Sequence, residues 1–321
     1  MSKKTAFVLG DQGPSGYFRI ALPCAALNEV GVDVGFAFSY EDFAGADILV
    51  FQRQHRSAAV EEIFKWQSRG KKIVVDFDDN FLQLDPTNKA RLVYTAPVAA
   101  DLKRLIGAAD VVTVATKPLA DLYGEYAKKV YLIPNALPPR AFAKIKQPSD
   151  KIIIGWHGSD SHFSDLKLVK NALAQIQRRH NVDLVLAGYE PPGLFKRATF
   201  RPWVKFSPDL AYFDSFADFT IGICPLSKSP FNDCKSDLKW LEYSSLGIPV
   251  VASAAPPYDS IESGVTGLLA RNLSDWETHL TRLLGDEDLC RRLGRAAQAE
   301  VRAHRRIEAT IPLWQEMLDG L

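Results

Sequence analysis

Short apolar runs alternate with longer amphipathic stretches along this chain, and this alternation occurs twice. In the first half the runs are 5–9, 32–38, 47–51, 72–76, 111–115 and 130–133, with helical stretches near 17–28, 57–68, 98–106 and 118–126. In the second half the runs are 152–155, 183–187, 219–223, 249–252 and 266–269, with helical stretches near 163–179, 210–216, 233–246, 275–284, 287–302 and 306–318. Such a series is typical of parallel sheets covered on both faces. The sequence therefore predicts an α/β protein with two Rossmann-like units, whose ligands lie beyond the carboxyl ends of the strands.

A proline-rich segment separates the two series. Residues 134–150 contain Pro134, Pro138, Pro139 and Pro148 and fit neither a strand nor a helix. We therefore expect an N-terminal Rossmann-like domain over 1–140, a second over 150–305 and a final helix over 306–321. A length of 321 residues suits two domains of ordinary size.

Composition is that of a globular enzyme, with 47% apolar and 24% charged residues. The net charge of +1 provides no overall basic field that would attract nucleic acid. The four cysteines form no close pair and no zinc spacing, and the start MSKKTAFVLG lacks the apolar stretch of a signal peptide. We therefore expect reduced thiols and a cytoplasmic location. No apolar run approaches the length of a membrane span, although peripheral membrane contact stays open.

The most informative segment for function is 231–252, which reads FNDCKSDLKWLEYSSLGIPVVA. Asn232 and Asp233 are good N-caps, and Gly247 is a good stop, so we expect one helix over 234–246 followed directly by a strand. Such a helix would place the two lysines and the glutamate of this segment on one face, at positions i, i+4 and i+7.

Those three residues are Lys235, Lys239 and Glu242. Lysines near a helix N-terminus oppose the helix dipole, and a bound phosphate would relieve this conflict. The lysines, the hydroxyl of Ser236 and backbone N–H groups would then converge on the phosphate, and Glu242 could accept hydrogen bonds from a sugar hydroxyl. The alternative is a solvated helix face on which Lys239 and Glu242 form a simple ion pair.

The stretch LEYSSLGIPVVAS resembles the signature segment of GT-B glycosyltransferases, in particular the family 4 type, where a helix carries E-A-x-A-x-G-x-P-V-V-A-S. The fuller form FNxCKSxLKWLEY resembles a divergent branch found in bacteria and phages. The resemblance implies two Rossmann-like domains that face each other across a cleft, and a last helix that crosses back to the N-terminal domain. It also implies that Glu242 holds the ribose of a nucleotide-sugar donor and that transfer retains the anomeric configuration. Cys234 stands where the family has a further glutamate.

A second segment, IGWHGSDSH over 154–162, follows the first strand of the second half. Its glycines and serines suit a close backbone approach to a phosphate, and the resemblance implies that Gly158 and Ser159 lie beside the donor diphosphate. His157 and His162 could donate to phosphate or act as acid or base. The alternative is a plain turn in which His162 caps the next helix. By the same resemblance, Pro225 and Leu226 end a strand near the donor.

The N-terminal half supplies candidates for an acceptor site. The glycines at 10, 13 and 16 do not form the G-x-G-x-x-G of dinucleotide-binding proteins, so an NAD enzyme is disfavoured. The run VDFDDN over 75–80 could bind Mg²⁺, but we prefer an acceptor or structural role for its carboxylates and expect no metal. The residues that we place on the acceptor side are Gly13, Ser15, Gly16, Arg19, Arg53, Asp76 and Asp78.

Together these features predict a hexosyl- or pentosyltransferase that uses a nucleotide diphosphate sugar and needs no organic cofactor. We expect His157, Lys235 and Glu242 to act in catalysis. The donor would contact Gly158, Ser159, Pro225, Leu226, Asp233, Ser236, Lys239 and Glu242. The preferred acceptor is a glycan or a lipid-linked glycan precursor. A hydroxymethylated base in phage DNA is the alternative that the phage members of the resembling branch suggest, and the locally basic segment 53–72 is compatible with it. A sugar-phosphate epimerase and a non-catalytic nucleotide-sugar-binding protein also remain open.

Overall fold

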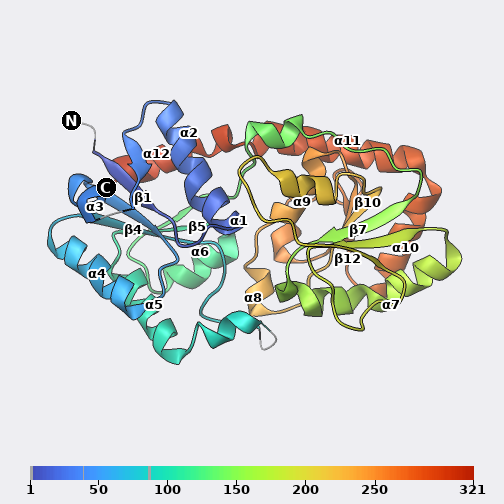
Figure 1. Cartoon of the computed structure of the whole chain (residues 1–321), viewed down its shortest axis with the longest axis horizontal. Helices are drawn as coiled ribbons and strands as arrows, with labels where there is room; N and C mark the ends of the chain where they lie inside the picture. Colours follow the sequence, from blue (N-terminus) through green and yellow to red (C-terminus); the bar gives the residue numbers. More distant parts are fainter. Residues whose placement is uncertain (1–2, 39, 86–87) are drawn as a thin grey trace. The chain divides into compact units, whose positions relative to one another are not determined.

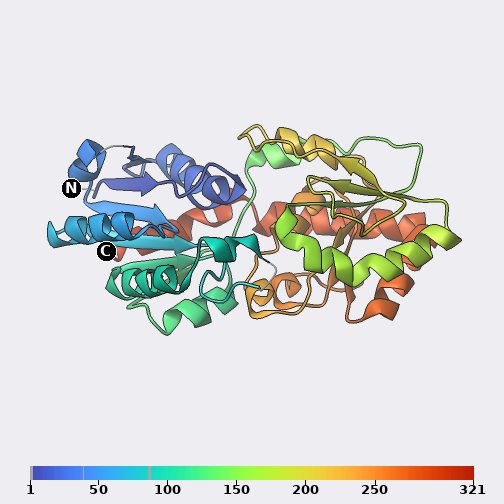
Figure 2. The ribbon, with the colours of Figure 1, turned by 60° about the horizontal axis from the view of Figure 1, so that its bottom comes forward.

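The computed structural model describes residues 3–38, 40–85 and 88–321, with the side chain of Tyr40 left aside. Two compact units make up the chain (Figures 1 and 2). Unit 1 contains Met1–Ala136, Asp233–Ser236 and Ile307–Leu321, and unit 2 contains Leu137–Asn232 and Asp237–Arg306. Each unit is built around its own six-stranded sheet, and every strand pair in both sheets is parallel.

The sheet of unit 1 has the order β2-β1-β3-β4-β5-β6. Its strands are β1 Thr5–Val8, β2 Val34–Phe36, β3 Ile48–Gln52, β4 Lys72–Phe77, β5 Val111–Val114 and β6 Val130–Leu132. Its helices are α1 Pro14–Gly16, α2 Leu22–Glu29, α3 Tyr40–Gly45, α4 Ser57–Ser68, α5 Ala96–Ala108, α6 Lys117–Gly124 and α12 Ile311–Asp319, with a π-helical turn at Tyr17–Ala21. The strand order reverses between β1 and β3, which marks the usual ligand position of such sheets.

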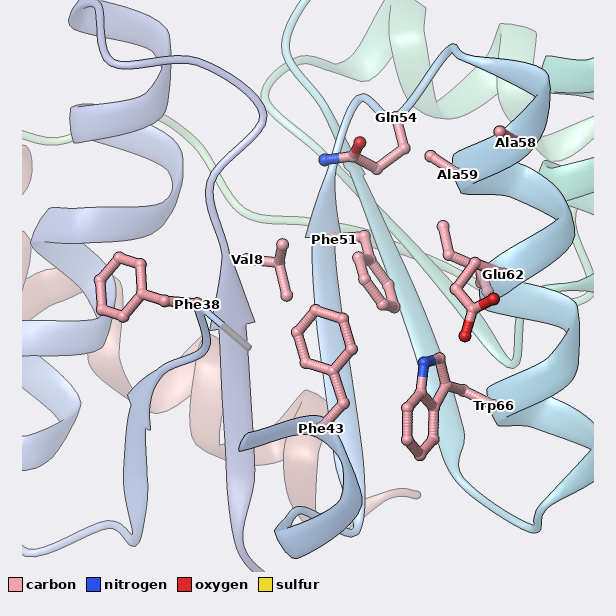
Figure 3. A pocket seen from close by; sticks show the side chains of 10 residues that line it. Val8, Phe38, Phe43, Phe51, Gln54, Ala58, Ala59, Glu62 and Trp66 are labelled. Carbon is pink, nitrogen blue, oxygen red and sulfur yellow. The ribbon is translucent and has the colours of Figure 1, made fainter. Parts of the chain in front are cut away.

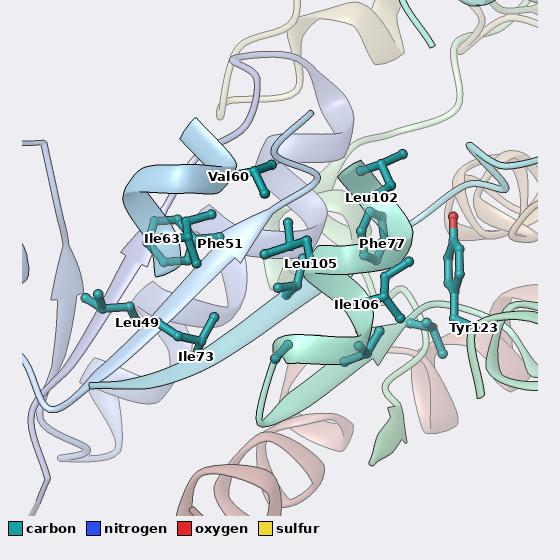
Figure 4. Packing of buried hydrophobic residues seen from close by; sticks show 14 of the residues in the cluster. Leu49, Phe51, Val60, Ile63, Ile73, Phe77, Leu102, Leu105, Ile106 and Tyr123 are labelled. Carbon is teal, nitrogen blue, oxygen red and sulfur yellow. The ribbon is translucent and has the colours of Figure 1, made fainter. Parts of the chain in front are cut away.

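Alternating side chains of β3 show how the unit 1 sheet is covered on both faces. Leu49 and Phe51 pack with α4 and α5 in one core (Figure 4), whereas Ile48 and Val50 pack in a second core with residues of α2 and α12. This period of two is that of a strand buried on both faces. The C-terminal helix α12 therefore belongs to the core of unit 1, with Trp314 buried against Phe7 at a ring-centroid distance of 5.7 Å.

The sheet of unit 2 has the order β12-β11-β10-β7-β8-β9, with the reversal between β7 and β10. Its strands are β7 Ile153–His157, β8 Asp183–Ala187, β9 Thr199–Arg201, β10 Ile221–Cys224, β11 Val250–Ser253 and β12 Leu268–Ala270. Its helices are α7 Phe163–Arg179, α9 Leu238–Ser245, α10 Leu273–Gly285 and α11 Glu287–His304, and α8 Pro230–Asp233 ends at the boundary with the unit 1 segment. The α/β class and the doubled parallel sheet predicted from the sequence are confirmed.

The two faces of the unit 2 sheet differ in what they pack against. Ile221 and Ile223 of β10 join the core formed with α7 and α10, whereas Gly222 faces Tyr243 of α9. A Cβ atom on Gly222 would lie 2.7 Å from Cδ2 of Tyr243, so only glycine lets α9 approach this closely. The absence of a side chain at Gly222 thus allows α9 to pack directly against the sheet.

The prediction of one helix over 234–246 is wrong. The helix α8 ends at Asp233 and α9 begins at Leu238, so Lys235 lies in a non-helical segment and does not share a helix face with Lys239 and Glu242. Tertiary hydrogen bonds explain the interruption, because the carbonyl of Cys234 accepts from Oγ1 of Thr116 at 2.8 Å instead of from a following N–H group. The side chain of Ser236 likewise accepts from Nδ2 of Asn135 at 2.9 Å.

None of the described helices is both long enough and apolar enough to cross a membrane.

Candidate functional site

The carboxyl edge of the unit 2 sheet gathers some of the residues that the sequence assigned to a donor, namely His157, Gly158, Lys239 and Glu242. The strand β7 ends at His157, next to β10, where the strand order reverses. Side chains alternate along β7, so His157 shares a face with Gly155 and lies on the same side as α9, whereas Trp156 packs in the core with α7. The local pattern of β7 therefore directs the imidazole toward α9.

The imidazole of His157 lies in an aromatic cage. Its ring stacks on Phe216 at a centroid distance of 4.3 Å and an interplanar angle of 13°, and meets the edge of Tyr243 at 5.0 Å. Nε2 of His157 lies 3.0 Å from Oε2 of Glu242. Burial lowers the pKa of His157, and the nearby Lys239 acts in the same direction, while Glu242 opposes both. The imidazole is therefore neutral at pH 7 and can act as a hydrogen-bond donor or acceptor.

Glu242 projects from α9 and is held by two partners. Its Oε1 accepts a short hydrogen bond from the hydroxyl of Tyr212, and its Oε2 lies against His157. The side chain is only 5% exposed. A carboxylate offers about four acceptor positions, so these contacts orient Glu242 and leave lone pairs for a further hydroxyl.

Lys239 brings positive charge to the end of β7. Its Nζ donates to the carbonyl of His157 at 2.9 Å and lies 5.3 Å from the ring centroid of Trp156. The ammonium group is thus fixed beside the loop that follows β7. Anions that approach this loop would meet both the ammonium group and the backbone N–H groups.

The loop after β7 packs closely against neighbouring residues. The N–H of Gly158 donates to the carbonyl of Ala187 at 3.0 Å, and a Cβ atom on Gly158 would lie 2.6 Å from Cζ2 of Trp156. The adjacent Ser159 has its Oγ 2.9 Å from Oγ of Ser161. Only glycine fits at position 158, because the ring of Trp156 leaves no room for a Cβ atom.

Asp165 of α7 connects this loop to the loop after β10. It accepts from Nδ1 of His162 at 2.7 Å, from both N and Oγ of Ser227 at 2.7 Å, and from Nδ2 of Asn232 at 2.8 Å. Burial alone would raise the pKa of Asp165, but the hydrogen bonds from His162 and Ser227 hold it below its usual value. His162 therefore has a structural partner and stabilises the loop.

The predicted donor residues that follow β10 lie mainly beneath the surface. Pro225 and Leu226 are buried, and the N–H of Leu226 donates to Oγ of Ser253 at 2.8 Å. Asp233 and Ser236 belong to the segment that clusters with unit 1. The structure therefore brings His157, Gly158, Lys239 and Glu242 together in unit 2, whereas Lys235 and its neighbours are held by unit 1.

Two residues predicted on the acceptor side are buried instead. Arg19 and Asp76 form an ion pair, with Nη2 and Oδ2 at 2.6 Å and side chains 2% and 0% exposed. Arg19 also donates to the carbonyl of Ile133 at 2.6 Å, and Oγ1 of Thr113 donates to Asp76 at 2.8 Å. The expectation that Arg19 and Asp76 rim an acceptor site is therefore corrected, because a paired and buried charge holds elements together.

The remaining acceptor candidates gather at the carboxyl edge of unit 1. Arg53, which follows β3 with a φ of 33°, makes a short ion pair with Asp11, and its Nη1 lies 3.6 Å from Oδ1 of Asp78. Lys235 pairs with Asp79 at 3.5 Å; burial raises the pKa of Asp79, and Lys235 opposes that shift. A strained backbone at a non-glycine residue is a recurrent mark of functional sites.

The glycine-rich loop after β1 is tied to this cluster. The N–H of Gly13 donates to Oδ1 of Asp11 at 2.6 Å, and Ser15 and Gly16 lie in the short α1 that follows. The side chain of Gln52 accepts from the N–H of Gly10 at 2.9 Å. The loop is thus hydrogen-bonded to the end of β3, and Asp11 lies beside Arg53.

Sequence reasoning missed two residues of these clusters. Tyr212 lies in the 3-10 helical turn Ala211–Ser215 and carries no motif, and its partner Glu242 is 30 positions away in sequence, so no local signal indicates the contact. Asp11 directly follows the first strand and its glycine, and a carboxylate at a strand end was a usable signal. Among the residues that the structure describes, no group of three or more His, Cys, Asp and Glu is arranged to hold a metal ion.

Known structures share this architecture over almost the whole chain. A sucrose-phosphate synthase from Thermosynechococcus elongatus aligns with a TM-score of 0.72 at 16% identity, and Anabaena HepE in complex with UDP and glucose aligns at 0.71 and 15%. An alpha-glucosyltransferase in complex with UDP and a 13-mer DNA containing an HMU base aligns at 0.70 and 13%. Each alignment covers 99% of this chain and 100% of the other. No curated protein sequence matches the chain.

The two Rossmann-like units and these alignments define the fold as GT-B. The family match goes further, because residues 151–286 match the family model described as "Glycosyl transferases group 1". The chain is accordingly a glycosyltransferase, and the matched range lies in unit 2 except for residues 233–236. The resemblance seen in the signature segment around Glu242 is thereby confirmed.

Proposed function

We propose that the chain transfers a sugar from a UDP-sugar to an acceptor hydroxyl and that the donor binds at the carboxyl edge of unit 2. The observation that carries this proposal is the cluster of His157, Glu242, Tyr212 and Lys239 at the strand-order reversal. HepE, which has the same fold, was solved with UDP-glucose. In the proposed complex Glu242 accepts hydrogen bonds from the ribose.

The charges of the cluster suit the departure of a diphosphate. Lys239 and the N–H groups of the loop that begins at Gly158 would bind the diphosphate oxygens, and their attraction grows as negative charge develops on the leaving group. We propose that these groups suffice without a divalent cation. Because Nε2 of neutral His157 faces Oε2 of Glu242 at 3.0 Å, its other ring nitrogen, Nδ1, would accept a hydrogen bond from a hydroxyl of the sugar.

For the acceptor we propose a glycan or a lipid-linked glycan precursor, received by the Arg53 and Asp78 cluster of unit 1. The near-neutral charge of +1 supports this choice, because binding to DNA relies on neutralising phosphates. A second candidate is a modified base in DNA, favoured by the fold shared with the alpha-glucosyltransferase that was solved with HMU-containing DNA. Transfer with retention is part of the proposal, and NMR of the product's anomeric proton tests it.

The decisive experiment measures UDP release from UDP-sugars with and without acceptors. A transferase releases UDP quickly only when an acceptor is present, whereas a non-catalytic binder gives a thermal shift and no release. A donor at about 100 times its dissociation constant stabilises the protein by about 2.7 kcal/mol. Activity should persist in EDTA; loss in EDTA with rescue by Mg²⁺ or Mn²⁺ would refute the metal-independent part of the proposal.

A further inference from the structure

Unit 1 carries an apolar pocket beside its sheet that the proposed donor site does not use. The pocket has a volume of about 370 Å³ and lies between β1 and β3 on one side and α3 and α4 on the other (Figure 3). Small-molecule sites commonly have volumes of about 300–1,000 Å³. The pocket exists because α3 has only 6 residues, whereas α4 and α5 on the same face have 12 and 13. The short crossover leaves part of the sheet without a full helix above it.

Aromatic rings fix the walls of this pocket. Phe43 meets Phe51 and Trp66 edge to face, each at a centroid distance of 5.8 Å, and Phe51 and Trp66 are 3% and 4% exposed. Val8 and Ile63 add aliphatic surface. These packed side chains present hydrocarbon to the pocket, so its interior favours an apolar occupant.

The polar side chains of the pocket disfavour an anionic occupant. Glu62 of α4 points toward the pocket in Figure 3, and its carboxylate pairs with Lys65 at 3.0 Å. Gln54 lies where β3 ends, and its amide donates to the carbonyl of Gln52 at 3.2 Å. A phosphate that entered here would meet the carboxylate of Glu62 among apolar walls. The occupant that fits has an apolar body and keeps its polar part near Gln54.

An exposed aromatic side chain lies at the same pocket. Phe38 lines it and is 82% exposed, which is unusual for so large an apolar group beside a hollow. A hydrocarbon ligand would cover this ring and gain the associated burial energy. The exposed ring therefore supports an apolar ligand at the mouth of the pocket.

Two residues that line the pocket, Val8 and Gln54, are close in sequence to the candidate acceptor edge of unit 1. Val8 ends β1, three residues before Asp11, and Gln54 directly follows Arg53. A molecule that places its apolar part between Val8 and Trp66 would therefore place its head near the Asp11 and Arg53 pair. Both parts of this arrangement lie within unit 1.

We infer that this pocket binds the apolar tail of an amphipathic acceptor, so that the acceptor is a lipid-linked or hydrophobic glycoside. The inference rests on the proposed function, since it assigns the tail to one side of the proposed acceptor site. Binding of the tail positions the hydroxyl group of the head beside Arg53 and Asp78.

The test is a calorimetric titration of the full chain with methyl, hexyl and octyl β-D-glucopyranosides below their micelle-forming concentrations. For one site per chain, the dissociation constant should fall about fourfold for each added methylene until the pocket is full. Ala59→Phe and Ala58→Phe place a ring into the pocket from a partly exposed and an exposed position of α4. Each substitution should raise the dissociation constant of octyl glucoside by at least about tenfold and leave that of methyl glucoside unchanged. Ala296→Phe on α11, at a residue of the same partial exposure as Ala59, should match the wild type.

Three outcomes would overturn the inference: no dependence on chain length, binding at many sites, or wild-type octyl glucoside affinity in both α4 variants. Binding of an oligonucleotide with a hydroxymethylated base that the α4 variants abolish would also overturn it, because the pocket would then hold a base. UDP-glucose binding is measured on the same proteins. If the wild type binds UDP-glucose but shows no dependence on chain length, only the inference about the pocket is refuted. If the wild type does not bind UDP-glucose, the proposed function is refuted.

Discussion

At the scale of single residues, the environment of Glu242 explains why one carboxylate can serve both structure and ligand binding. Tyr212 and His157 hold its two oxygens in fixed directions, and the aromatic rings around His157 exclude water from one side. A carboxylate oriented in this way needs no reorganisation when a hydroxyl arrives. In the proposed complex the negative charge of Glu242, and not only the shape of its side chain, would bind the hydroxyl.

Glu242→Gln is therefore expected to weaken binding of the UDP-sugar by about 10- to 150-fold, because a hydrogen bond to a charged group contributes about 1.5–3 kcal/mol. Tyr212→Phe removes only one supporting hydrogen bond, so it should weaken binding of the UDP-sugar less than Glu242→Gln does. Isothermal titration with UDP-glucose measures both variants. Equal affinity of Glu242→Gln and the wild type would show that the donor does not use this carboxylate.

The lowered pKa of His157 predicts a pH dependence of stability. The folded protein keeps His157 neutral, whereas the unfolded chain takes up a proton below about pH 6.5. The unfolded state then binds more protons, so the free energy of unfolding falls as the pH drops below about 6.5, by at most about 1.4 kcal/mol per pH unit for this group. The fall ends once the pH passes the lower folded-state pKa.

Urea unfolding at pH 7.5, 6.5 and 5.5 checks this expectation when the wild type is compared with His157→Gln. The variant lacks the titrating group, so its stability should fall less over this range. The difference between the two proteins isolates His157 from all other titrating groups. The same change of the free energy of unfolding with pH in both proteins would show that His157 does not cause it.

At the scale of elements, the interruption between α8 and α9 separates two lysines that the sequence grouped together. Lys239 stays with the β7 loop through the carbonyl of His157, whereas Lys235 is paired with Asp79. The repeat of lysine and glutamate at helical spacing was a sound local signal. Hydrogen bonds from Thr116 and Asn135, more than 100 positions away in sequence, overrode it. Such long-range partners leave no trace in local sequence.

Lys239→Ala is expected to lower kcat/KM for the UDP-sugar by about 10- to 150-fold, on the same scale of about 1.5–3 kcal/mol for a charged hydrogen bond. Lys235→Ala should have a smaller effect, because Asp79 already offsets its charge at 3.5 Å. Steady-state kinetics of the two variants give the comparison directly. A larger loss for Lys235→Ala would contradict this ranking and would favour a phosphate contact by Lys235, as expected from the sequence.

The buried Arg19 and Asp76 pair joins the π-helical turn at Tyr17–Ala21 to β4, with further bonds to Thr113 and Ile133. Arg19→Met leaves the carboxylate buried without its partner and should lower the free energy of unfolding by about 3–5 kcal/mol. The double variant with Asp76→Leu should recover much of this loss, since apolar replacements of buried pairs are often neutral. Urea unfolding of both variants measures this, and equal destabilisation of the two would contradict it.

At the scale of the whole molecule, alternation of apolar runs predicted both parallel sheets, but it missed the short edge strand β9 Thr199–Arg201 of unit 2. The predicted strand 183–187 coincides with β8 Asp183–Ala187, whereas the predicted strand 152–155 stops two residues before the end of β7 at His157. The sequence could not predict that Arg19 and Asp76 face each other, because their residue types suit a ligand site and a buried pair equally well. It also could not predict that 233–236 joins unit 1, because that depends on contacts between distant segments.

The path of the chain between the two units has a consequence for engineering. The chain changes unit after residues 136, 232, 236 and 306, so no single cut divides it into two complete parts. A fragment that ends at 136 would lack Trp314 and Met317 from its core, and a fragment over 137–306 would carry Cys234 without the Asn80 that contacts it. Exchanging unit 1 with that of a related enzyme therefore requires three separate pieces of sequence to be transplanted together.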